Sequence, residues 1–134
     1  MREGVKYTGV PSPEELAGIP GIAGDARFEE GPVAVIECVQ EIPCNPCEKA
    51  CPFGAIPVGQ PITNLPVIDE NKCTGCGACL AKCPGLAIFR VQKNYTDTTA
   101  MIEFPYEYLP VPEAGATVPC GGRDGGYICD GKVI

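Results

Sequence analysis

Histidine and tryptophan are absent from this chain of 134 residues. Without histidine there is no imidazole for general base catalysis near neutral pH, no Ser-His or Cys-His nucleophile pair and no zinc finger of the mixed cysteine-histidine kind. The sequence also lacks a nucleotide-binding GxGxxG motif and a P-loop. We therefore expect that the chain is not an enzyme on its own.

Basic residues and long apolar runs are scarce as well. Ten Lys and Arg against 17 Asp and Glu give a formal net charge of -7, which opposes binding to nucleic acid and anionic lipid and favours a protein partner with a basic docking face. No run of 18 apolar residues indicates a membrane span, and the first residues lack the apolar core of a signal peptide. We expect a cytoplasmic protein.

The chain is rich in cysteine, with ten residues, and contains 17 glycines and 15 prolines. So much Gly and Pro disfavours long helices and leaves a small hydrophobic core. Because the cytoplasm keeps thiols reduced, clustered cysteines there indicate metal ligation before disulfides. A metal framework is expected to supplement the core.

An internal repeat with a period of 32 residues organises the cysteines. The shift superimposes one Cys-x2-Cys-x3-Cys-Pro run on another, matching Cys44, Cys47, Cys51 and Pro52 to Cys76, Cys79, Cys83 and Pro84. The flanks agree, because residues 35–37 fall on 67–69 and residues 55–56 on 87–88. Each half is therefore predicted to form a strand, a cysteine loop, a short helical turn and a second strand, in a pseudo-twofold domain.

The second half has the spacing typical of bacterial ferredoxins, Cys73-x2-Cys76-x2-Cys79-x3-Cys83-Pro84. A cysteine at every third residue wraps three thiolates around one face of an iron-sulfur cubane. Gly75 and Gly77 allow backbone N–H groups to turn toward the cluster sulfurs. The run therefore predicts a [4Fe-4S] cluster.

The first half departs from this pattern at its start. Three residues before Cys44, where a cysteine is expected, stands Glu41, and the nearest cysteine is Cys38. Either Cys38 reaches the cluster across a longer loop, or Glu41 supplies a carboxylate. We favour Cys38, because iron-sulfur centres select thiolate ligands.

These runs resemble the bacterial-type 2[4Fe-4S] ferredoxin family over residues 31–95. The resemblance implies an α+β fold, the pseudo-twofold βαβ-βαβ domain, with two [4Fe-4S] clusters. In this family the fourth cysteine of each run ligates the other cluster. By that rule one cluster is held by Cys38, Cys44, Cys47 and Cys83, and the other by Cys73, Cys76, Cys79 and Cys51. The competing interpretation of the same cysteines is two structural zinc sites, which would use separated CxxC pairs.

A narrower resemblance rests on GPVAVIECVQEIPCNPCEKACPFGAI and CTGCGACLAKCPGLAIF. These segments are similar to the small ferredoxin-like subunits of FAD-dependent dehydrogenases of the proline, hydroxyproline and opine type. The resemblance implies electron transfer within a complex that contains a flavoprotein subunit. The alternatives are a free-standing soluble ferredoxin and a redox-sensing or structural iron-sulfur protein.

Extensions are expected on both sides of the ferredoxin domain, at residues 1–30 and 96–134. Ser12, Pro13 and Glu15 predict a short capped helix. A strand is expected at residues 99–104, and a β-hairpin turning at 124–126. This hairpin carries Cys120 and Cys129, which we expect to face each other outside both clusters.

Overall fold

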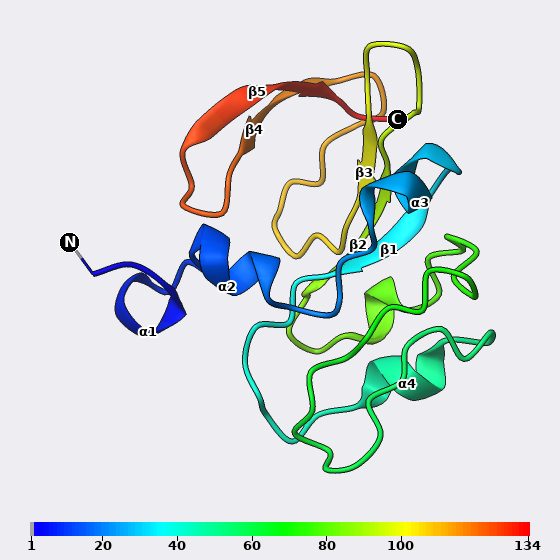
Figure 1. The fold of residues 1–134 in the computed structure, drawn as a ribbon. Helices are drawn as coiled ribbons and strands as arrows, with labels where there is room; N and C mark the ends of the chain where they lie inside the picture. The colour runs from blue at the N-terminus through cyan, green and yellow to red at the C-terminus, as the bar shows by residue number, and fades with distance from the viewer. Residues whose placement is uncertain (1) are drawn as a thin grey trace. The chain divides into compact units, whose positions relative to one another are not determined.

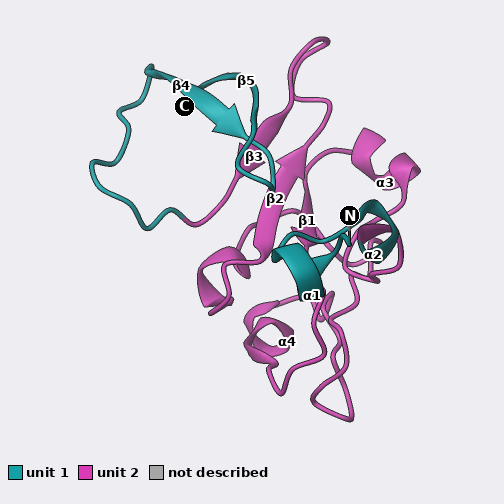
Figure 2. Ribbon diagram, turned by 90° about the vertical axis from the view of Figure 1, so that its left-hand side faces the viewer, with its two compact units in different colours: residues 1–15, 106–134 teal, residues 16–105 magenta. Residues whose placement is uncertain are grey.

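The computed structural model describes residues 2–134, which fall into two compact units (Figures 1 and 2). The larger unit is Leu16–Pro105, and the smaller one combines the N-terminal residues up to Glu15 with Tyr106–Ile134. The larger unit is wider than the 31–95 span of the repeat, because residues on both sides of that span pack within it. The helices of residues 2–134 fall short of the length and apolar character that crossing a membrane requires.

A three-stranded antiparallel sheet organises the larger unit. Strand β1 (Val33–Ile36) pairs with β2 (Ile88–Gln92), and β2 pairs in turn with β3 (Met101–Glu103) (Figure 1). All four residues of β1 are buried, as expected for its unbroken run of apolar side chains. The strands predicted near these positions are confirmed, and together with the helices they give an α+β fold.

The helices are all short, as the glycine and proline content predicted. They are α1 (Val5–Thr8), α2 (Pro13–Ala17), α3 (Asp25–Glu29) and α4 (Pro46–Ala50), with a 3-10 turn η1 at Leu80–Lys82. The capping box of α2 is confirmed: the Glu15 N–H donates to the Ser12 hydroxyl at 3.2 Å, and the Ser12 N–H to the Glu15 carboxylate at 2.8 Å.

The strands predicted at residues 55–56 and 67–69 do not form; the backbone at residues 55–57 and 67–69 makes only a short antiparallel contact. Asp69 N–H donates to the Ala55 carbonyl at 2.8 Å, and Glu37 N–H donates to the Ala87 carbonyl at 2.9 Å. The two donors are related by the 32-residue repeat, and so are the two acceptors. Leu86, with φ 53°, repeats the left-handed conformation of Gly54, with φ 64°. The two halves thus share local hydrogen bonding as well as sequence.

The hydrophobic core of the larger unit is built around isoleucines that the repeat relates in pairs. Ile36 and Ile68 are one pair, Ile56 and Ile88 the other, and all four are less than 9% exposed. Burying each of these side chains contributes about 1.5–3 kcal/mol. Both halves therefore contribute equivalent side chains to one core.

Residues 19–24 also belong to this core. The Gly21 carbonyl accepts a hydrogen bond from Ile36 N–H at 2.9 Å, and the Pro20 carbonyl accepts one from Ile68 N–H at 3.1 Å. Ile36 and Ile68 are repeat partners, so this segment joins equivalent positions of the two halves. A side chain at Gly21 would meet the Ile36 carbonyl oxygen 2.2 Å from its Cβ.

The smaller unit contains the predicted hairpin, formed by β4 (Thr117–Gly121) and β5 (Tyr127–Lys132). Cys120 lies directly opposite Cys129 in its register, with a bulge after Cys120. Both thiols are free. The structure therefore confirms that these two cysteines face each other.

We expect Gly21→Ala to destabilise the protein by about 1–3 kcal/mol, because the new methyl group overlaps backbone that cannot move independently of β1. Urea denaturation of the anaerobically prepared protein measures this loss. Gly85→Ala is the matched control, since a Cβ at Gly85 meets no atom within 4 Å. Equal stability of the two variants would contradict the close packing of residues 19–24.

Candidate iron-sulfur sites

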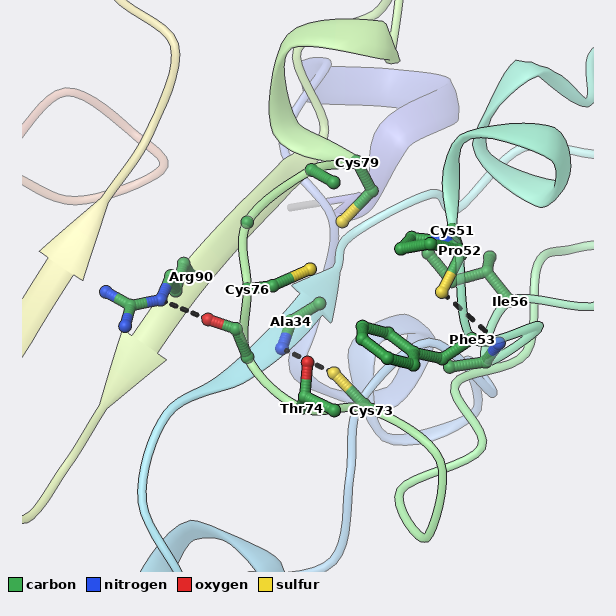
Figure 3. Close-up of a pocket in the computed structure, with 14 residues that line it drawn as sticks. Ala34, Cys51, Pro52, Phe53, Ile56, Cys73, Thr74, Cys76, Cys79 and Arg90 are labelled. Carbon is green, nitrogen blue, oxygen red and sulfur yellow. Dashed lines mark hydrogen bonds between the residues drawn. The ribbon is translucent and has the colours of Figure 1, made fainter.

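One hollow of the larger unit gathers four of the predicted ligands, Cys51, Cys73, Cys76 and Cys79 (Figure 3). Three of them follow one another along the loop before η1, and their sulfur atoms point toward a common space in Figure 3. Cys51 reaches the same space from the end of α4 in the other half. The hollow therefore combines three cysteines of one run with the last cysteine of the other.

A second hollow gathers the other four predicted ligands, Cys38, Cys44, Cys47 and Cys83. Cys83, which ends η1, completes it from the second half. The two hollows enclose similar space, about 340 and 380 Å³ including regions open to solvent. All eight predicted ligands thus lie in two groups of four, and their ligation of iron stays a prediction.

Cys38 and Glu41 occupy different positions relative to the second hollow. Cys38 is half-buried and lines the hollow, whereas Glu41 is exposed and is not among its lining residues. Gln40 and Ile42, which flank Glu41, do line it. This placement favours Cys38 over Glu41 as the fourth ligand.

Backbone N–H groups point at several of the sulfur atoms. Ala55 N–H lies 3.3 Å from the Cys51 sulfur, and its repeat partner Ala87 N–H lies 3.4 Å from the Cys83 sulfur. Ala34 N–H of β1 lies 3.4 Å from the Cys73 sulfur. Such donors stabilise thiolates and raise the reduction potential of an iron-sulfur cluster. The donor set therefore fits a cluster ligated by four thiolates.

Gly75 shapes the loop of the first hollow. Its φ of 70° is strained for any residue with a side chain, and a Cβ would lie 2.3 Å from the Pro32 carbonyl oxygen. The loop can therefore lie against the residue before β1 only with glycine here.

Burial changes the acidity of several thiols. It raises the pKa of Cys79 to about 11, and the negative charges of neighbouring cysteines add to the rise. Burial is also the main cause of the raised pKa of Cys47 and of Cys38. In the absence of iron these thiols are protonated at neutral pH, so cluster binding releases protons and weakens as the pH falls.

Two arginines that the sequence analysis did not single out contact the loop of the first hollow. Arg90 of β2 lines the hollow and donates through Nε to the Gly75 carbonyl (Figure 3). Arg27 of α3 donates to the Cys73 carbonyl at 2.8 Å. Their acceptors are backbone carbonyls distant in sequence, which leave no motif by which they could be found.

A single zinc ion held by four thiolates would draw each sulfur to about 2.3 Å from one centre. Within residues 2–134 no three Cys, Asp or Glu side chains converge in the way that a single ion requires.

The comparison with protein families matches the second half of the repeat. Residues 66–89 match the family model of the 4Fe-4S binding domain. This stretch holds Cys73, Cys76, Cys79 and Cys83 and ends in β2. The match supports a 4Fe-4S cluster as a cofactor of this chain, and the cysteines that ligate it stay a prediction.

Known proteins with similar sequences include components of redox complexes. One component of an ion-translocating oxidoreductase complex from Methanosarcina acetivorans is 55% identical over 47 residues, 35% of this chain and 17% of that protein. The polyferredoxin-like subunit of aliphatic sulfonate oxidoreductase from Pyrococcus furiosus is 48% identical over 48 residues, 36% of this chain and 27% of that protein.

A longer alignment involves a subunit of selenate reductase from Mesobacillus selenatarsenatis, which is 34% identical over 104 residues, 76% of this chain. The chain spans only 32% of that subunit, and still less of the other two proteins. No solved structure matched.

Cys38→Ala is expected to remove about half of the bound iron, because it takes one thiolate from the second hollow and leaves the first intact. Glu41→Ala is the matched control and should retain all of it. Iron and acid-labile sulfide analysis of both variants measures the difference. Loss of iron in Glu41→Ala alone would make Glu41 the ligand.

Proposed function

We propose that the chain transfers electrons through two [4Fe-4S] clusters, one in each hollow. The observation that carries this proposal is the grouping of eight cysteines into two sets of four, each with one member from the opposite half. Four thiolates saturate the external positions of the four irons, so no iron is left open to a substrate. Such a centre accepts and donates single electrons.

We also infer that the two sites are related by a pseudo-twofold axis. Supporting this are the hydrogen bonds from Ala55 to Cys51 and from Ala87 to Cys83, which repeat after 32 residues with nearly the same length. The shared core of repeat-related isoleucines points the same way. Two cubanes in one small domain would pass electrons between them.

The electron donor is proposed to be a flavoprotein dehydrogenase subunit of the proline, hydroxyproline or opine type. The similarity to small ferredoxin-like subunits supports this, as do relatives named as subunits of oxidoreductase complexes. Thiolate-ligated cores would add negative charge to the formal -7 of the chain. A basic docking face on the partner, in the cytoplasm, is therefore proposed, and salt should weaken the complex.

Exposed apolar residues of the smaller unit favour the interpretation of this chain as a subunit of a complex over that of a freely diffusing ferredoxin. Within it Tyr108 is 74% exposed, Leu109 88%, and Tyr127 and Ile128 about two thirds. Apolar residues this exposed, in addition to a ferredoxin domain, are typical of surfaces that a partner covers.

The electron capacity of the chain tests this function. Controlled-potential coulometry of the anaerobic wild-type chain is expected to deliver about two electrons per chain, one for each cluster. Cys76→Ser should lower this capacity to about one, because loss of this thiolate removes the cluster of the first hollow.

Cys120→Ser is the matched control, since Cys120 lies in the β4–β5 hairpin and lines neither hollow. It should keep the full capacity. A wild-type chain that takes up no electrons would exclude electron transfer, and lost capacity in Cys120→Ser would overturn the assignment of ligands.

A further inference from the structure

Arg27 is a buried arginine, and its side chain carries a positive charge at any pH that the protein experiences. Only 8% of its surface is exposed. The guanidinium donates hydrogen bonds to four backbone carbonyls at 2.8–3.3 Å, those of Gly31, Pro32, Glu70 and Cys73. These bonds use four of its five N–H donors and fix its position beside the loop of the first hollow.

This charge has no counterion among the side chains of residues 2–134. No ion pair of Arg27 with a carboxylate is found there, whereas Lys72–Asp69 and Arg90–Glu103 are ion pairs. Carbonyl dipoles offset part of the cost of burying a charge, but a buried cation is ordinarily paired with an anion. The proposed cluster of the neighbouring hollow would supply one, because Cys73 and the other three cysteines bind iron as thiolates.

Arg90 approaches the same loop from β2. Its Nε donates to the Gly75 carbonyl and its Nη1 lies 3.2 Å from Glu103. Arg90 lines the hollow, whereas the Glu103 side chain is 58% exposed. Since solvent screens an exposed carboxylate, Arg90 keeps part of its positive field at the hollow.

The second hollow has a different electrostatic environment. Among the residues that the structure describes, those that line it include the neutral polar residues Gln40 and Asn64 and no lysine or arginine. The linings of the two hollows therefore differ in charge, because Arg90 lines the first and no basic residue lines the second. The pseudo-twofold relation of the sequence does not extend to Arg27, which lies before the repeat.

We propose that Arg27, assisted by Arg90, gives the cluster of Cys51, Cys73, Cys76 and Cys79 the higher reduction potential, so that an electron entering the domain comes to rest there. Reduction adds one electron, and thus one negative charge, to the cluster core. A fixed cation in a poorly polarisable environment stabilises that charge. The electron passes from the cluster of the second hollow, which is oxidised as the other is reduced. This inference rests on the proposed function.

The first test removes the charge. In Arg27→Gln we expect one-electron reduction of this cluster to become about tenfold less favourable, a shift of about 59 mV to lower potential. Arg27→Lys keeps the charge with fewer hydrogen bonds and should stay close to wild type. Lys82→Gln, which removes an exposed charge at the last residue of η1, is the matched control and should also stay close. EPR-monitored redox titration measures all four proteins.

A second test leaves Arg27 in place, and so decides the question even if Arg27→Gln does not fold. Cys44→Ser is expected to retain only the cluster beside Arg27, and Cys76→Ser only the other. The potential measured for Cys44→Ser should be higher than that for Cys76→Ser. Equal potentials or the reverse order would overturn the inference.

The outcomes separate this inference from the function on which it rests. Two clusters in the wild type, with the same potentials in Arg27→Gln, would overturn the role of Arg27 and leave electron transfer standing. An equal shift in Arg27→Lys and Arg27→Gln would also overturn it, because hydrogen bonding instead of charge would then set the potential. A wild-type chain without iron would overturn both.

Discussion

Cys51 and Cys83 each end one cysteine run and line the hollow of the other, and the rest of the larger unit depends on this exchange. Each hollow combines three cysteines of one half with one of the other. The proline that follows each of these cysteines ends the helical turn and directs the chain into the core, where Ile56 and Ile88 are buried. The proposed clusters would thereby link the backbone of the two halves.

The same arrangement sets the electrostatics of the domain. Thiolates carry negative charge into a small core, and peptide N–H groups at Ala34, Ala55 and Ala87 offset it locally. The buried guanidinium of Arg27 lies beside the loop of the first hollow, where it donates to the Cys73 carbonyl. Burial that keeps Cys79 protonated in the absence of iron makes folding and cluster binding interdependent. Stability and redox behaviour thus come from the same contacts.

The cysteine loop of the second half and helix α2 could be predicted from the sequence, because the residues that determine each of them are close together in the chain. The spacing from Cys73 to Cys83 fixes a loop geometry, and the capping box of α2 needs only Ser12 and Glu15. Arg27 and Gly21 could not be found in this way. Arg27 contacts Cys73 across 46 residues, and Gly21 accepts from Ile36. Their partners are backbone groups, which any sequence provides, so neither contact leaves a pattern.

The number of clusters per chain can be measured on one anaerobic sample. Iron and acid-labile sulfide are measured on the purified wild-type chain, and EPR spectra are recorded after full reduction of the same sample. Two clusters predict about eight iron and eight sulfide ions per chain, with EPR signals broadened by two interacting spins. Bound zinc without iron, or about four of each with one isolated spin, would contradict this prediction.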